Sequence, residues 1–237
     1  MLLSTAIECH EIPGDLQQYE LHEVQVLDVI PLDISPCVLK KARHGDQECM
    51  LILYSPTAEH ICQYFEYLRM CFQVEHDNVV KIHGICCFPD SPYPALVMEE
   101  LEPLSHFVKN CDTISEKDQI RLVLDIIHAV SAYEAMPVLV QVVVKAIFVS
   151  SLQDIRAKFF PVFGCSYSSA LRHTSKSHSS NLQWLSDIVV FLNGRGQPVE
   201  RTLPPEHALE PVIRGWLQRS SPLSTVTEEL EYLFRKL

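Results

Sequence analysis

Residues 76–86 read HDNVVKIHGIC, and the chain changes in character on either side of this stretch. From residue 79 onward, VVKIHGICCF (79–88) favours a strand, and YPALVMEEL (93–101) favours a second one. Before it, residues 57–75 favour a helix. Their apolar side chains recur on one helical face, at Ile61, Phe65, Leu68 and Phe72. The quoted stretch is therefore expected to lead from a helix into a sheet.

Three further strands are predicted closer to the N-terminus. They are HEVQVLDVI (22–30), CVLKKAR (37–43) and CMLILYS (49–55). Turn-forming residues separate them: Pro31, Pro36 and the tripeptide His44-Gly45-Asp46. Together with the two strands after residue 78, they predict a small antiparallel sheet.

The remainder of the chain is predicted to be mainly helical. Residues 115–136 begin with Ser115 and Asp118 in a capping-box-like relation. Apolar residues then repeat at helical spacing, at Ile120, Val123, Leu124, Ile127 and Val130. Three more helices are expected at 181–193, 207–219 and 224–237, with Trp184 and Trp216 at buried helix positions. A sheet with one helix, followed by a helical half, is the order of a two-lobe α+β protein.

Composition narrows the class of protein. The chain has 237 residues, of which 47% are apolar, so it can bury a full core. Its formal net charge of −11 argues against a nucleic-acid or anionic-membrane partner, because such partners need clustered Lys and Arg. The N-terminus has no basic segment before its short apolar run, so no secretory signal is expected. We therefore expect a cytoplasmic protein.

The metal-binding residue types show no ligand spacing. Nine cysteines include no C-x-x-C pair, and the histidines follow no H-x-x-x-H or H-E-x-x-H pattern. We expect no metal site, no disulfide framework and no cofactor.

Residues 137–151, PVLVQVVVKAIFVSS, form the most apolar segment of the chain. They are too few for the ~20 apolar residues of a membrane-spanning helix, and Lys145 interrupts them. Two short buried strands, at 138–144 and 146–150, are expected instead. No membrane span is predicted.

The order of these segments resembles that of the eukaryotic protein kinases, most closely their tyrosine-kinase and tyrosine-kinase-like branches. HDNVVKIHGIC is similar to the kinase stretch that leads from the N-lobe helix into the fourth strand. ALVMEELEPLSHFVKN (95–110) looks like the fifth strand, the hinge and the next helix. RAKFFPVFGCS (156–166) resembles the strand leading into Asp-Phe-Gly, and residues 213–233 resemble the last two helices.

The resemblance implies a two-lobe kinase-like fold over residues 22–237. The N-lobe would cover about 22–99 and the C-lobe about 103–237, after an N-terminal extension at 1–21. Around the cleft, Met98 would be the gatekeeper, and the hinge would be Glu99, Glu100 and Leu101.

Phosphoryl transfer needs a glycine-rich loop, a lysine held by a glutamate, a base, and ligands for magnesium. Where the glycine-rich loop would fall, residues 30–38 read IPLDISPCV, with two prolines and no glycine. The lysine position falls on Ile52 or Leu53, and its glutamate partner on Tyr67 or Glu66. The resemblance thus implies a cleft without the residues that bind phosphate.

The catalytic loop is altered in the same way. Leu139, Val140 and Gln141 stand at the His-Arg-Asp positions, and Ala146 stands at the metal-binding Asn. Val162 replaces the metal-binding Asp of Asp-Phe-Gly. A glutamine side chain cannot act as a base at neutral pH, and an alanine side chain offers no oxygen to magnesium.

These departures predict a pseudokinase, a kinase-shaped module without catalysis that binds proteins in signalling, acts as a scaffold or acts as an allosteric module. Two alternatives stay open. The first is weak nucleotide binding or an atypical kinase, in which Lys145, Asp154 and Lys158 substitute for the missing groups. The second is an unrelated α+β interaction domain. The Ser- and His-rich segment 168–180 is a further hypothesis, as a phosphorylation target or a docking site for an acidic partner.

Overall fold

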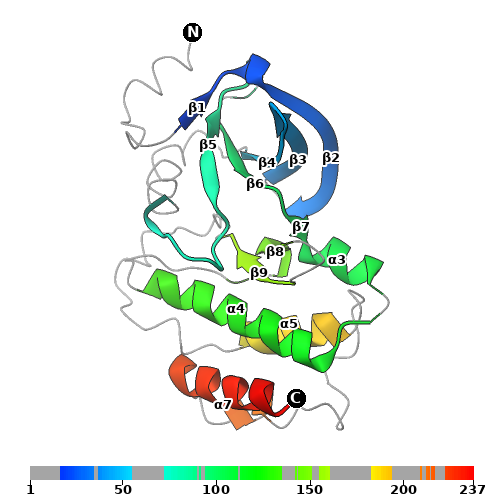
Figure 1. Ribbon diagram of the computed structural model, residues 1–237, viewed down its shortest axis with the longest axis vertical. Helices are drawn as coiled ribbons and strands as arrows, with labels where there is room; N and C mark the ends of the chain where they lie inside the picture. The colour runs from blue at the N-terminus through cyan, green and yellow to red at the C-terminus, as the bar shows by residue number, and fades with distance from the viewer. Residues whose placement is uncertain are drawn as a thin grey trace. The chain divides into compact units, whose positions relative to one another are not determined.

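The computed structural model of the chain combines two β-sheets with helices, so the α+β class is confirmed (Figure 1). It describes residues 17–34, 37–54, 72–89, 91, 94–111, 113–134, 142, 144–150, 155–160, 183–193, 209, 212–213, 215–216 and 222–237. The chain divides into two compact units. Unit 1 is Met1–Glu75 with Val79–Leu101, and unit 2 is His76–Asn78 with Glu102–Leu237.

Unit 1 contains a six-stranded sheet in the order β1-β5-β6-β4-β3-β2. Its strands are β1 Gln17–Tyr19, β2 Val24–Ile34, β3 Cys37–His44, β4 Gln47–Tyr54, β5 Ile82–Cys86 and β6 Ala95–Glu99. Each neighbouring pair is antiparallel except β1 and β5, which run parallel. The five strands predicted from the sequence are therefore confirmed. β1 was missed, because it lies within the range expected to be an N-terminal extension.

Two features of the β2–β3–β4 segment follow from local chemistry. Gly45 has a φ of 58° in the turn between β3 and β4, a conformation that glycine adopts without steric cost, and the expected turn is confirmed. The predicted end of the first strand at Pro31 is wrong, because β2 continues to Ile34. β2 is an edge strand, and its pairing with β3 is irregular between Ile30 and Ile34, where proline is tolerated.

The sheet of unit 1 is apolar on both faces. One face carries a buried cluster of Val24, Ala42, Cys49, Leu51, Cys86 and Val97. The side chains that alternate with these along the strands are also fully buried. They include Leu39, Met50, Ile85, Leu96 and Met98. Successive side chains of a strand point to opposite faces, so burial of both registers indicates a sheet covered on both sides.

Unit 2 contains a three-stranded sheet, β7-β8-β9, formed by Glu102–Pro103, Ile147–Val149 and Ala157–Phe159. A short 3-10 helix, η3 (Val144–Ala146), leads into β8. The strand expected at 138–144 is therefore wrong at Val144. Residues 138–141 and 143 lie outside the described part of the chain.

The helices of unit 2 are α3 (Leu104–Asn110), α4 (Glu116–Glu134), α5 (Gln183–Asn193) and α7 (Leu223–Lys236). Helix α4 contacts β9, α5 and α7. All five apolar residues predicted for its buried face are buried, which confirms the helical spacing. The strip runs along the whole helix, so α4 forms the centre of this unit's core.

Helix α4 begins as its sequence predicts. The Ser115 hydroxyl accepts a hydrogen bond from the Asp118 backbone N–H at 3.1 Å and donates one to the Asp118 carboxylate at 2.6 Å. This is an N-cap in which the two side chains also bind each other, a variant of the expected box.

The two tryptophans differ. Trp216 is buried as expected, and its indole N–H donates to the Glu229 carboxylate of α7 at 2.7 Å. Trp184 of α5 is only half-buried, so its expected burial is wrong in degree. None of the described helices is long and apolar enough to cross a membrane.

Several predictions fall outside the described residues. They concern the helix before residue 72, the segment 161–182, the loop 194–206 and most of the helix expected at 207–219.

Candidate functional site

The expected cleft residues of unit 1 lie on β4 and β6 and just after β6. Met98 is fully buried and pairs in register with Met50 of β4 and Ile82 of β5. Leu101 is also buried, and its backbone N–H lies 3.2 Å from the sulfur atom of Met50. These side chains act as packing residues of the sheet.

The strand position expected for a phosphate-binding lysine is apolar in both registers. Ile52 is buried, and Leu53 is half-buried against the cluster that contains Cys49 and Val97. Because the two side chains point to opposite faces of β4, neither face carries a cation at this position.

Glu99 is the last residue of β6, and it binds the backbone of Lys81, the residue before β5. Its carboxylate accepts a hydrogen bond from the Lys81 backbone N–H at 2.6 Å, and its own N–H donates to the Lys81 carbonyl at 3.1 Å. The side chain thus extends the β5–β6 pairing by one residue.

Glu100, the residue after Glu99, forms an ion pair with Lys41 of β3. The Lys41 ammonium nitrogen lies 3.3 Å from the Glu100 carboxylate and 3.5 Å from that of Glu48. The hydrogen bond to Glu100 raises the pKa of Lys41. All three side chains are exposed, so these pairs add little stability.

Of the four catalytic-loop positions aligned with His-Arg-Asp and the metal-binding Asn, the structure describes Ala146. It is fully buried at the end of η3, and its carbonyl accepts the Phe160 N–H at 2.9 Å. The three residues that follow it in β8 are buried as well. The side chain at this position is therefore part of the core of unit 2. Leu139, Val140, Gln141 and Val162 lie outside the described residues.

The proposed substitute cations lie near this segment of the chain. Lys145 is exposed on η3, and Lys158 is half-buried on β9. Asp154 lies outside the described part of the chain.

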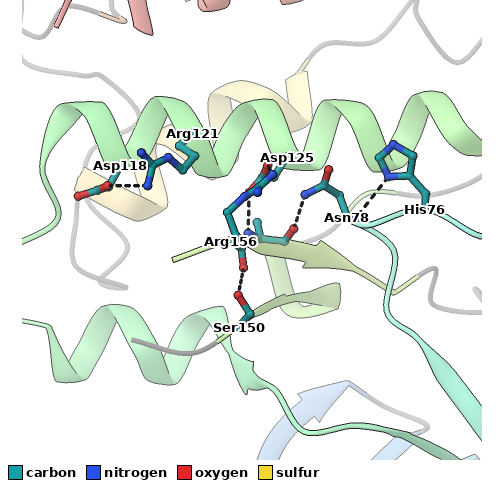
Figure 2. Close-up of polar contacts among 8 residues, drawn as sticks. His76, Asn78, Asp118, Arg121, Asp125, Ser150 and Arg156 are labelled. Atoms are coloured by element: carbon teal, nitrogen blue, oxygen red, sulfur yellow. Dashed lines mark hydrogen bonds and ion pairs between the residues drawn. The ribbon is translucent and has the colours of Figure 1, made fainter. Parts of the chain in front are cut away.

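A buried polar network in unit 2 was missed by sequence reasoning (Figure 2). The Arg156 guanidinium donates to both carboxylate oxygens of Asp125, at 2.9 and 2.7 Å. The Ala157 backbone N–H donates to the same carboxylate at 3.0 Å. The Asp125 side chain is 3% exposed and that of Arg156 is 42% exposed. The pair therefore joins the middle of α4 to the start of β9.

Asn78 extends this network from the stretch that precedes β5. Its side-chain amide donates to the Ala157 carbonyl at 3.2 Å, and its own carbonyl accepts the Phe159 N–H at 2.8 Å. The His76 ring nitrogen Nδ1 accepts the Asn78 backbone N–H at 3.1 Å (Figure 2). Residues 76–78 are thereby fixed against β9, within unit 2.

The hydrogen bonds of this network hold α4 and β9 together. The Asp125 carboxylate accepts three hydrogen bonds, two of which form a bidentate pair with the Arg156 guanidinium, so its oxygens are committed to this arrangement. One signal in the sequence pointed to it: Asp125 is the only charged residue within the apolar run 122–127 of the predicted helix. Such a residue needs a partner when it is buried, but the sequence does not say which one.

The thiol of Cys86 is buried on β5. Burial raises the pKa of the Cys86 thiol to about 11, so it is protonated at neutral pH and is no nucleophile. No cluster of three or more His, Cys, Asp and Glu residues that could hold a metal ion occurs among the described residues.

An open hollow lies at the β2–β3 end of unit 1. It is lined by His22, Glu23, Gln25, Arg43, His44 and Gly45. Arg43 within it pairs with Glu48 at 3.3 Å. The hollow is open to solvent and is lined mainly by polar residues, whereas small-molecule sites are mostly enclosed and apolar.

Comparison of the chain with protein-family models and with curated proteins gives no match in either case.

Proposed function

We propose that this chain is a protein-kinase-like domain that has lost phosphoryl transfer and acts by binding other proteins. The observation that carries the proposal is Ala146. In the alignment to the kinase pattern it replaces the asparagine that holds magnesium, and in the structure its methyl group is fully buried. Because the Ala146 side chain is packed in the core of unit 2, there is no room beside it for a metal ion and its water ligands.

The order of elements supports the kinase-like part of the proposal. An antiparallel succession, β2-β3-β4, is followed by β5 and β6, and then by a helical unit with a small sheet. The positions aligned with catalytic residues support the proposal by their order along the chain. Ala146 directly precedes β8, and the stretch expected to contain Asp-Phe-Gly follows β9.

The absence of a lysine at the phosphate-binding position supports the proposed loss of phosphoryl transfer. Replacing the lysine by Ile52 or Leu53 leaves no cation on β4 to hold a triphosphate. Burying such an apolar side chain stabilises the fold by about 1.5–3 kcal/mol. The substitutions thus favour stability over binding of a nucleotide.

The test is a thermal melt of the full chain with and without millimolar ATP, first with magnesium and then with EDTA. We expect no shift in melting temperature. A ligand at 100 times its Kd adds about 2.7 kcal/mol. Because each kcal/mol raises the melting temperature of a chain of this size by roughly 2–4 °C, such a ligand would raise it by about 5–11 °C. A shift of several degrees that needs magnesium would contradict the proposal.

If a shift occurs, two variants locate the cations responsible. Lys145→Ala and Lys158→Ala should each reduce the shift if these side chains replace the missing lysine. Lys109→Ala on α3 is the matched control, because that lysine lies at the end of a helix remote in sequence from both.

A further inference from the structure

Strand β1 is bound to the sheet of unit 1 in the manner of a short peptide. It has only three residues and pairs in parallel with β5, in the register Gln17↔Gly84, Gln18↔Ile85 and Tyr19↔Cys86. Gln17 and Gln18 are exposed, and Tyr19 is the only residue of the strand that is partly buried. Among the described residues, β1 is therefore held by its backbone pairing with β5 and by one side chain.

Gly84 of β5 makes room for this strand. A Cβ atom at residue 84 would overlap the carbonyl oxygen of Gln17 and would lie 2.8 Å from a ring carbon of Tyr19. The three atoms nearest to such a Cβ all belong to β1. The absence of a side chain at this position thus serves the bound strand, and the edge of β5 is shaped to receive a backbone.

Tyr19 anchors the strand. Its ring packs against the buried cluster that contains Cys49 and Cys86, and it meets the ring of His44 edge-on at 4.8 Å. Burial raises the pKa of Tyr19, and the neighbouring Cys49 and Glu23 raise it further. The hydroxyl remains at the surface and donates to the Gln17 side chain at 3.3 Å. A partly buried ring with an exposed hydroxyl is the usual form of an aromatic anchor at an interface.

We propose that the β5 edge is a docking site for an extended segment of another protein, and that β1 occupies this site in cis. In this mode of recognition the backbone supplies affinity and a pocket for alternate side chains supplies specificity. The partner segment would run parallel to β5, with an aromatic side chain in the place of Tyr19 and neutral polar residues at the two positions before it.

The small size of β1 is the reason why exchange is feasible. A three-residue strand with one anchor contributes few interactions, so a longer partner segment with the same anchor can replace it. The cis segment competes as a tethered ligand, which lowers the apparent affinity for a partner until β1 leaves. The inference rests on the proposed role in protein binding, but it does not depend on the kinase-like fold.

The experiment uses the full chain and a fluorescent synthetic peptide with the sequence of residues 15–21, DLQQYEL. Tyr19→Ala in the protein removes the anchor of the cis strand and should open the site. We expect the peptide to bind this variant roughly tenfold more tightly than the wild-type chain, because the competing ligand is weakened. The same peptide with alanine in place of its tyrosine should not bind.

Gly84→Ala, added to the Tyr19→Ala protein, should abolish binding, because the new methyl group occupies the space of the incoming backbone. Gly45→Ala is the matched control. Gly45 lies in the β3–β4 turn at positive φ, and a Cβ there meets no atom within 4 Å. It should reduce stability and leave peptide affinity unchanged. Circular dichroism of each variant shows whether the sheet is retained.

Three results would overturn the inference: no binding to the Tyr19→Ala protein, binding that survives Gly84→Ala, or binding that does not need the tyrosine of the peptide. Concentration-dependent dimers of the wild-type chain that Gly84→Ala abolishes would also overturn it, since the occupant would then be a second copy. These results are distinguishable from failure of the proposed function, which the ATP melt decides.

Discussion

At the scale of single residues, Asp125 is the one buried charged side chain in the described part of the chain. Its partner Arg156 is 31 positions away in sequence and reaches it from the start of β9. Taking a carboxylate out of water is costly, and the cost is offset only if the charge is paired and its oxygens accept hydrogen bonds. The three donors observed here meet that condition.

Arg156→Met should reduce the free energy of unfolding by about 3 kcal/mol, because it leaves the Asp125 carboxylate buried with only the Ala157 N–H. Asp125→Leu should cost less, since the guanidinium left behind is partly exposed and can be solvated. The double variant should be less destabilised than the sum of the two. Urea unfolding of all three variants measures this coupling.

Arg121→Met is the matched control for that cycle. Arg121 lies 3.7 Å from Asp118 one turn away on the same helix, and both side chains are about one-third exposed. An exposed pair of this kind contributes about 0–1 kcal/mol. Equal losses for Arg156→Met and Arg121→Met would show that the buried pair is not the stronger one.

The residues of the candidate site were predictable to different degrees. The alignment to the kinase pattern selected Ala146, and the apolar residues after it made its burial predictable. The pairing of Asp125 with Arg156 was not predictable, because it depends on how α4 packs against β9. Helical spacing identifies which residues are buried, but it does not identify the neighbour that each of them meets.

At the scale of elements, the helices and strands with strong periodicity were the predictable ones. Helix α4 has a regular apolar strip and an N-cap signal, and both were recognised. Strand β1 was not, because Gln-Gln-Tyr has no apolar alternation and its conformation depends on the edge of β5. Pairing with a distant strand can thus impose a structure that local sequence does not indicate.

The N-cap of α4 gives a prediction at this scale. Ser115→Ala should reduce the free energy of unfolding by about 1 kcal/mol, since the Asp118 N–H loses its acceptor. In a chain of this length the melting temperature should fall by roughly 2–4 °C. Ser115→Asn is the control, because asparagine is as good an N-cap and should retain most of the stability. If both variants melt at the same temperature, the cap does not stabilise the helix.

At the scale of the whole molecule, the stretch HDNVVKIHGIC belongs to both units. Its first three residues group with unit 2, and the residues from Val79 onward belong to the sheet of unit 1. The sequence indicated a transition from helix to strand here. It did not indicate that residues 76–78 bind to β9 through Asn78, because the partners of Asn78 lie about 80 positions later in the sequence.

Asn78→Ala should therefore affect unit 2, although its neighbours in the chain are mostly in unit 1. The side chain is 3% exposed, and its loss leaves the Ala157 carbonyl without the amide donor. An unsatisfied buried group costs about 1–3 kcal/mol. Hydrogen exchange should become faster at Ala157, at Phe159 and along α4, and remain unchanged along β3 and β4.

Asn110→Ala provides the comparison. Asn110 is exposed at the end of α3 and donates to Glu102 at 3.3 Å, so its replacement should change stability by less than about 0.5 kcal/mol. Faster exchange in β3 and β4 equal to that in α4 and β9 would contradict the grouping of residues 76–78 with unit 2. Faster exchange confined to α4 and β9 would mean that residues 76–78 stabilise unit 2. The stretch 76–86 would then contribute its first three residues to the structure of unit 2 and the residues from Val79 onward to the sheet of unit 1.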